Sequence, residues 1–193
     1  AADMYQIGAA IDQSILANSK KWGVSQSDID DWGANWTVGF SPYFDGNPKL
    51  LHEVGKSIEV VYYNKDWLNE LGLAEPQTPT EFAEAACAAT NSTFSGRVGD
   101  TASLGYEIDT DASNFAAWVF AHGGDVFDYN AGQYILNSKE AVAAMEFIQG
   151  MANKGCAQVT RDKYADQQYL GLGSNLFALS STSGITYFQK AIE

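Results

Sequence analysis

The sequence of 193 residues has few positive charges. Its 11 Lys and Arg face 24 Asp and Glu, which gives a formal net charge of −13 at neutral pH. No Lys/Arg cluster is longer than Lys20-Lys21. The chain therefore has no cationic segment of the kind that binds a phosphate backbone or an anionic lipid surface. We expect neither nucleic acid nor a membrane surface as its partner.

Histidines, cysteines and long apolar runs are also scarce. With only His52 and His122, and without Cys-x-x-Cys spacing, the sequence has no pattern of metal ligands, so we expect no metal and no cofactor. No apolar run approaches the roughly 18 to 20 residues of a membrane span. The start, Ala1-Ala2-Asp3-Met4, lacks the regions of a signal peptide. Cys87 and Cys156 fit either one disulfide or two buried thiols.

Apolar and aromatic residues are abundant enough for a folded core. The chain is 46% hydrophobic and 13% aromatic with only four prolines, a composition typical of one or two globular domains. Thr78-Pro79-Thr80-Glu81 predicts a capping box and a helix ending at Asn91. Asn137-Ser138-Lys139-Glu140 predicts another capping box and a helix ending at Gly155. Shorter helices are expected over residues 64–73, 114–122 and 164–172, strands over 58–63 and 175–179, and a hairpin or turn over 125–134.

Helices that alternate with short strands predict a layered α/β fold, in which ligands bind at strand ends. The sequence has no Gly-x-Ser-x-Gly elbow, phosphate loop or dinucleotide fingerprint. Carboxylates such as Asp109 and Asp111 lie in polar runs typical of solvated surface. Tyr, Trp, Asn and Ser at strand ends suit a concave site for a neutral polar ligand, although they also suit an ordinary core with solvated turns. We expect a binding protein and not an enzyme.

One stretch resembles a known family. Residues 60–73 read VVYYNKDWLNELGL and are followed by Pro76 and by Thr78-Pro79-Thr80-Glu81-Phe82. In order, spacing and residue types this resembles the family 1 extracellular solute-binding proteins of bacterial ABC transporters, which include the maltose and glycerol-phosphate types. Residues 123–128 and 175–183 resemble two later blocks of that family, and residues 3–6 resemble an upstream strand.

The resemblance implies a type II periplasmic-binding-protein fold of the α/β class, with two lobes around a cleft. It implies that the chain is a fragment: residues 1–56 would be an incomplete part of the first lobe, and residues 57–193 a C-terminally incomplete second lobe. The implied function is capture of a mono- or oligosaccharide by aromatic stacking, hydrogen bonds and hinge closure. The implied partners are the carbohydrate and membrane permease subunits. The protein would be an extracytoplasmic monomer, made with a signal peptide and lipid-anchored in its full-length form.

The resemblance also assigns ligand-binding roles, position by position. Strand alternation lets only one of Tyr62 and Tyr63 face the cleft. Ser113 stands where maltose-type members have a stacking ring, with Trp118 as a possible substitute. Ser181 and Ser183 match a loop in which those members place a tryptophan, and these departures argue against maltodextrin itself. The full set of assigned residues is Tyr5, Gln6, Ser57, Glu59, Tyr62, Tyr63, Asp111, Ser113, Asn114, Trp118, Ser181 and Ser183.

An extracytoplasmic location, with both cysteines in one lobe, further implies a disulfide between Cys87 and Cys156. Two alternatives stay open. The solute could be glycerol phosphate, a polyamine or a metal chelate, although Arg97 and Arg161 are the only arginines available for a phosphate. The other alternative is an α/β glycoside hydrolase, based on the same aromatic residues and on scattered carboxylates.

Overall fold

The computed structural model of the chain divides into two units, residues 1–56 and residues 57–193, and each is described by itself. The structure describes residues 7–9, 19–23, 25–31, 57–160 and 162–193. In the first unit these include helix α3 (Gln26–Asp31). Ser25 precedes it, and its Oγ accepts a hydrogen bond of 3.2 Å from the backbone N–H of Asp28. Tyr5 and Gln6 lie outside the described residues, so their binding role stays a prediction.

The second unit is built on a four-stranded sheet with the order β1-β6-β2-β5. Strands β2 (Leu104–Ile108), β5 (Ala157–Val159) and β6 (Asn175–Ser181) are parallel to one another. Strand β1 (Glu59–Tyr63) runs antiparallel to β6, with Glu59 opposite Ser181. The first residue of β1 therefore lies at the edge where the parallel strands end. A separate hairpin pairs β3 (Phe127–Asp128) with β4 (Gln133–Tyr134).

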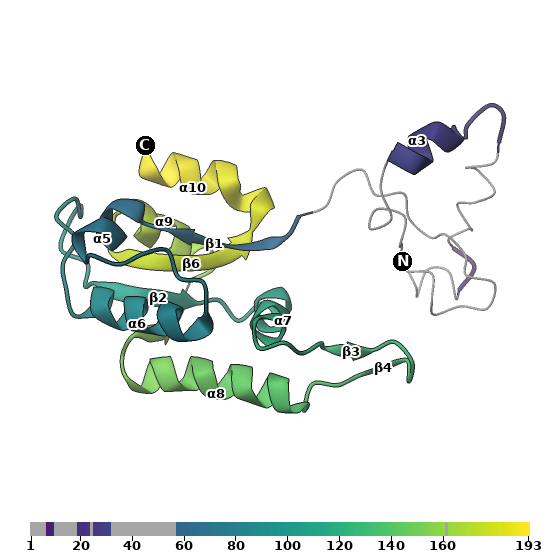
Figure 1. Cartoon of the computed structure of the whole chain (residues 1–193). Coiled ribbons are helices and arrows are strands. Elements are labelled where there is room, and N and C mark those ends of the chain that lie inside the picture. Colours follow the sequence, from purple (N-terminus) through teal and green to yellow (C-terminus); the bar gives the residue numbers. More distant parts are fainter. Residues whose placement is uncertain (1–6, 10–18, 24, 32–56, 161) are drawn as a thin grey trace. The chain divides into compact units, whose positions relative to one another are not determined.

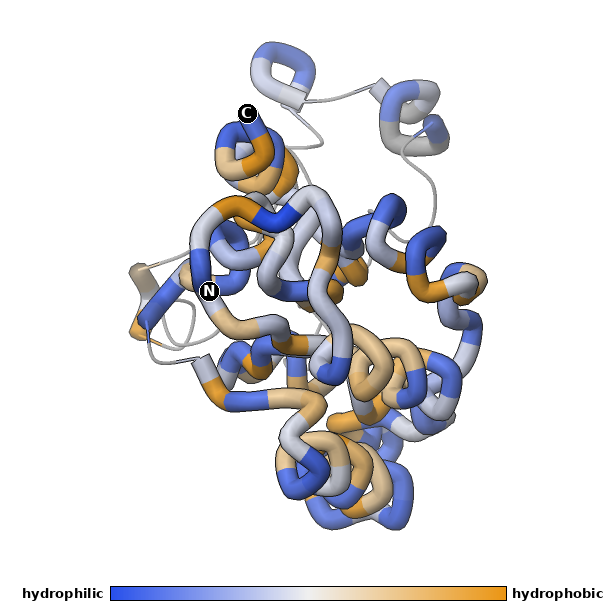
Figure 2. The backbone as a smooth tube through the Cα atoms, turned by 90° about the vertical axis from the view of Figure 1, so that its left-hand side faces the viewer, coloured by the Kyte–Doolittle hydropathy of each residue, from blue (hydrophilic) through white to orange (hydrophobic). Residues whose placement is uncertain are grey.

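Helices cover both faces of the sheet (Figure 1). Helices α9 (Ala165–Gly171) and α10 (Ile185–Ile192) lie over one face, and α6 (Pro79–Thr90) and α8 (Lys139–Asn153) over the other. Helices α5 (Lys65–Glu70) and α7 (Ala112–Ala121) complete the unit, with a short 3-10 turn at Thr182–Gly184. The helices carry both hydrophobic and hydrophilic residues (Figure 2), as expected where one side packs on a sheet. The predicted layered α/β architecture is confirmed.

One of the two predicted capping boxes is present and the other is wrong. At α6, the Oγ1 of Thr78 accepts from the N–H of Glu81 at 3.2 Å, and Glu81 Oε2 accepts from the N–H of Thr78 at 3.1 Å. At α8 the N-cap is Ser138 and not Asn137, and its Oγ accepts from the N–H of Ala141 at 3.1 Å. Ala141 then occupies the third helical position, where it has no carboxylate to return a hydrogen bond.

The core between the sheet and α6 is aromatic. The ring of Phe82 stacks on Phe177 with centroids 4.3 Å apart, and it meets Tyr106 and Trp118 edge-on at 5.2 and 5.1 Å. All four side chains are buried. Within the described part of the chain, no helix is long and apolar enough to cross a membrane.

A disulfide joins Cys87 on α6 to Cys156, which directly precedes β5. The two Cα atoms are 4.5 Å apart, and 69 positions separate the cysteines in sequence. The predicted pairing is confirmed. It ties the helix layer to the outer strand of the sheet.

Gly105 lies where β2 passes close to α6. The hydroxyl oxygen of Thr90 accepts the N–H of Gly105 at 2.8 Å, and a Cβ at Gly105 would collide with the backbone of Ala86. Gly105→Ala is therefore expected to lower the free energy of unfolding by about 1–3 kcal/mol. Gly150→Ala is the matched control, because a Cβ there meets nothing within 4 Å. In a helix interior it is expected to stabilise by about 0.5–1 kcal/mol. Urea denaturation checks both signs, and an equal effect of the two variants would contradict the close approach.

Candidate functional site

The predicted binding residues that follow or precede strands gather at one edge of the sheet. The parallel strands end there at Ile108, Val159 and Ser181, and β1 begins there at Glu59. The N–H of Thr182 donates to the carbonyl of Ile58 at 2.9 Å and ties the two chain segments together. In open α/β sheets, ligands bind outside this carboxyl edge. The predicted residues at or next to it are Ser57, Glu59, Asp111, Ser113, Asn114, Ser181 and Ser183.

A pocket of about 310 Å³ lies beyond the end of β6, and we call it the tyrosine pocket. Its lining combines two aromatic rings with hydroxyl and amide groups: Tyr164, Gln167, Ser180, Ser181, Ser183, Gly184 and Tyr187. The hydroxyl oxygens of Ser181 and Ser183 are 2.9 Å apart, and Ser181 Oγ also accepts the N–H of Ser183. The pocket therefore presents exposed rings and hydrogen-bonding groups on one surface.

Sequence reasoning missed Tyr164 and Tyr187. Their side chains are 60% and 62% exposed. Tyr164 is the N-cap of α9 with a φ of 67°, and it is the one residue other than glycine with positive φ among those described. A left-handed conformation is unfavourable for a tyrosine, and such strain is often found at functional sites. The one available signal was the loop of Ser181 and Ser183, which lacks the tryptophan that the family resemblance implies.

A second pocket of about 250 Å³ lies between the end of β2, α7 and α8, and we call it the acceptor pocket. Its polar side chains include Asp109, Asp111 and Asn114. Asp111 caps α7: its Oδ1 accepts from the N–H and from the hydroxyl of Ser113, each at 2.8 Å. These hydrogen bonds hold the pKa of Asp111 below its ordinary value, so its carboxylate is ionised. The apolar part of the lining is Tyr106, Ile108, Phe115, Trp118, Met145 and Ile148.

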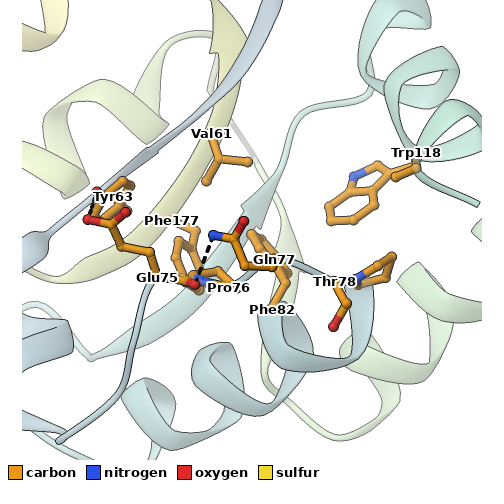
Figure 3. Close-up of a pocket in the computed structure, with 11 residues that line it drawn as sticks. Val61, Tyr63, Glu75, Pro76, Gln77, Thr78, Phe82, Trp118 and Phe177 are labelled. Carbon is orange, nitrogen blue, oxygen red and sulfur yellow. Dashed lines mark hydrogen bonds between the residues drawn. The ribbon is translucent and has the colours of Figure 1, made fainter.

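A third pocket, of about 320 Å³, opens on the α6 side of β1. Figure 3 shows Tyr63 and Glu75 at one end of it and Trp118 at the other. The Tyr63 hydroxyl donates to Glu75 Oε1 at 2.5 Å, and this hydrogen bond raises the pKa of Tyr63. The amide of Gln77 donates to the carbonyl of Glu75 at 3.2 Å and fixes the rim. The pocket thus has polar groups at its rim and core aromatic rings in its wall.

The two neighbouring tyrosines of β1 have different surroundings. Tyr63 lines the third pocket, whereas the ring of Tyr62 stacks on Phe188 of α10 at 3.9 Å and its hydroxyl donates to the carbonyl of Ser181 at 2.9 Å. Trp118 lines both the acceptor and the third pocket, but it is only 6% exposed. Its Nε1 donates to the Tyr106 hydroxyl at 3.3 Å. The binding roles of all three residues stay predictions.

Two carboxyl groups are buried near the carboxyl edge. Glu107 is 3% exposed and Asp166 is 6% exposed. Burial raises the pKa of both groups, and the charge of Asp109 raises each further. The Oε2 atom of Glu107 has no hydrogen-bond partner among the described residues. Across the same part of the chain, no group of three His, Cys, Asp or Glu side chains is placed to hold a metal ion.

Glu107→Gln is expected to stabilise the protein increasingly as the pH rises above 4.5, the ordinary value for this carboxyl. A raised pKa in the folded state means that the folded chain holds the proton more tightly, so wild-type stability falls as the group ionises. Glutamine resembles the protonated acid and avoids this loss. Urea denaturation at pH 4 and at pH 8 measures the difference, with Glu84→Gln on the exposed side of α6 as control. An equal effect of Glu107→Gln at both pH values would contradict the prediction.

Residues 2–172 match the family of bacterial extracellular solute-binding proteins, and the chain belongs to that family. No curated protein sequence gives a match. Solved structures of solute-binding proteins share the fold, which is that of type II periplasmic binding proteins.

UgpB of Mycobacterium tuberculosis, solved with glycerophosphocholine, aligns over 97% of this chain and 44% of its own, with 21% identity and a TM-score of 0.70. The maltose/maltodextrin-binding domain MalE of Bdellovibrio bacteriovorus, bound to maltotriose, aligns over 98% and 46%, with 15% identity and a TM-score of 0.68. The cyclic alpha-maltosyl-1,6-maltose binding protein of Arthrobacter globiformis aligns over 93% and 43%, with 18% identity and a TM-score of 0.65. The chain spans less than half the length of each.

Proposed function

We propose that this chain is part of the carbohydrate-binding component of an ABC importer. Residues 57–193 would form the second lobe and residues 1–56 would belong to the first, so that the carboxyl edge of the sheet is one wall of the ligand cleft. The observation that carries the proposal is the tyrosine pocket at that edge. Two exposed rings can stack on the apolar faces of a sugar, while Ser181, Ser183 and Gln167 bond its hydroxyl groups.

The charge of this edge supports a ligand that is not an anion. Glu59, Asp109, Asp111 and Asp162 lie at or near the strand ends, and Lys163 is the one cation described beside them. The described carboxylates would repel a sugar phosphate or an acidic sugar. A neutral or positively charged saccharide carries no such penalty, so glycerol phosphate is the weaker alternative.

The proposed mechanism is binding without covalent chemistry. The ligand enters an open cleft, groups of the second lobe engage one side of it, and hinge closure brings the first lobe onto the other side. A micromolar dissociation constant corresponds to about −8 kcal/mol, which stacked rings and a few buried hydrogen bonds can supply. We further propose delivery to membrane permease subunits on the outer face of the cell membrane, and a precursor with a signal peptide and a lipid anchor.

Tyr187→Ala is expected to weaken saccharide binding about fivefold to tenfold, because it removes one stacking surface of the pocket. Tyr164→Ala should act in the same direction. Tyr134→Ala is the matched control, since Tyr134 is 73% exposed but lies on the β3–β4 hairpin. Isothermal titration calorimetry with a panel of mono- and oligosaccharides measures the affinities. Binding of no saccharide, or equal binding by Tyr187→Ala and wild type, would contradict the proposal.

A further inference from the structure

The acceptor pocket has an unusual set of polar groups. Among the described residues, no Lys, Arg or His lines it. The carboxylates of Asp109 and Asp111 and the amide oxygen of Asn114 accept hydrogen bonds, and the hydroxyls of Thr110 and Tyr106 can do so as well. The two side-chain N–H donors of the lining are already used, because the indole N–H of Trp118 donates to the Tyr106 hydroxyl and the amide of Asn114 donates to the carbonyl of Leu179. A ligand group that enters this pocket therefore meets mainly oxygen acceptors.

Asn114 shows that one of these acceptors is left unused inside the protein. Its side chain is 3% exposed, and its Nδ2 donates to the carbonyl of Leu179 at 3.2 Å. This bond requires nitrogen on that side of the amide, so Oδ1 is the other atom. Oδ1 is buried and has no hydrogen-bond partner among the described residues. A buried acceptor without a donor costs free energy, and a donor bound in the pocket that Asn114 lines would remove that cost.

Asp111 supplies negative charge at the same place. Both of its hydrogen bonds with Ser113 go to Oδ1, and Oδ2 has no hydrogen-bond partner among the described residues. Lys163 is close enough to help hold the pKa of Asp111 low. Lys163 does not line the pocket, however, and no ion pair joins it to Asp111 among the described residues. The charge of Asp111 is therefore available to a cation that enters from solvent.

We propose that the acceptor pocket binds a protonated amino group, so that the solute of this protein is an amino-substituted saccharide. An ammonium group has three donors and no acceptor, which complements two carboxylates and the amide oxygen of Asn114. Hydrogen bonds from an ammonium group to carboxylates are charge-assisted and stronger than those between neutral groups. The saccharide part of the assignment rests on the proposed function, whereas the amine part rests on the pocket alone.

Calorimetric titration of the chain with four probes tests the proposal. Glucosamine carries the ammonium group, whereas glucose and N-acetylglucosamine are uncharged, and putrescine carries ammonium groups without a sugar. We expect glucosamine to bind at least about tenfold more tightly than either neutral sugar, the effect of one charge-assisted hydrogen bond.

Asp111→Asn should abolish this preference while preserving the fold, because asparagine caps a helix as well as aspartate does. Asp128→Asn is the matched control. It makes the same change in charge at a residue that also accepts backbone N–H groups, from Asn130 and Ala131, on the hairpin. It should retain the preference for glucosamine. Thermal unfolding of both variants checks that they are folded.

The outcomes separate this inference from the proposed function. Equal affinity for glucosamine and a neutral sugar would overturn the amine pocket and leave saccharide binding standing. A preference for glucosamine that survives Asp111→Asn would also overturn it, because the amine would then bind elsewhere. Binding of putrescine alone, lost in Asp111→Asn, would keep the amine pocket and overturn the saccharide assignment. Binding of none of the four probes would overturn both.

Discussion

Phe82→Ala is expected to lower the free energy of unfolding by about 3–5 kcal/mol, the largest effect of any single substitution considered for this chain. Phe82 is 4% exposed and is the centre of the aromatic core, where it stacks on Phe177 and meets Tyr106 and Trp118 edge-on. Its removal leaves a cavity between α6 and the sheet. These neighbours come from three other elements, so the cavity cannot close by the movement of one side chain.

The matched control for this prediction is Phe120→Ala. Phe120 lies on α7 and is 53% exposed, so its truncation removes little buried area and should cost less than about 1 kcal/mol. Urea denaturation followed by circular dichroism compares the two variants. A loss at Phe82 no larger than the loss at Phe120 would contradict the packing described for this core.

Replacing both Cys87 and Cys156 with serine is expected to cost about 2–4 kcal/mol. The disulfide closes a loop in which 69 positions separate the cysteines, and such a closure restricts the unfolded chain. The loop contains α7, the β3–β4 hairpin and α8, so the bond holds a large part of the second unit to α6. Urea denaturation of the double variant measures the cost.

Reduction of the wild-type chain provides the control for the disulfide prediction. With reductant, the wild type should approach the stability of the double variant, whereas the double variant should not respond. An unchanged denaturation midpoint in the double variant would contradict a stabilising role. Two thiols that can be alkylated without reductant would contradict the bond itself.

Much of the second unit could be predicted from local sequence signals. The cap at Thr78, the β-branched and aromatic run of β1, and the glycines that stop helices α7 and α8 each act within a few residues. Their effect does not depend on distant contacts. The predicted cap at Asn137 was wrong by one residue, because Ser138 is an equally good N-cap and only the packing of α8 decides between them.

Strands β2 and β5 were not predicted, for identifiable reasons. Strand β2 contains Gly105 and Glu107, both unfavourable in strands by propensity. The tertiary structure requires the first, because α6 passes directly over it, and buries the second. Strand β5 has only three residues, and Gln158 interrupts its apolar pattern. Both strands depend on pairing within the sheet, where β2 pairs with β5 and β6, and local sequence signals do not reveal such pairing.

The candidate site likewise contains some residues that could be assigned from the sequence and others that could not. Ser181, Ser183 and Asp111 could be assigned because the sequence around them resembles the solute-binding family, and the structure places them at or shortly after the ends of β6 and β2. Tyr164 and Tyr187 could not, because each lies in the first turn of a helix, and both reach the tyrosine pocket only through the packing of α9 and α10 on the sheet. The acceptor pocket depends likewise on α8, whose Met145 and Ile148 close one side of it.

The central claim is that this chain binds a saccharide at the carboxyl edge of its sheet. The most direct test is titration of isotope-labelled chain with each saccharide of the calorimetric panel, glucosamine included, followed by the chemical shifts of assigned backbone amides. The account predicts saturable shifts at Asp111, Asn114, Tyr164, Ser181 and Tyr187, with little change at the β3–β4 hairpin. Shifts confined to the hairpin or to the opposite edge of the sheet, or no saturable shift at all, would contradict it.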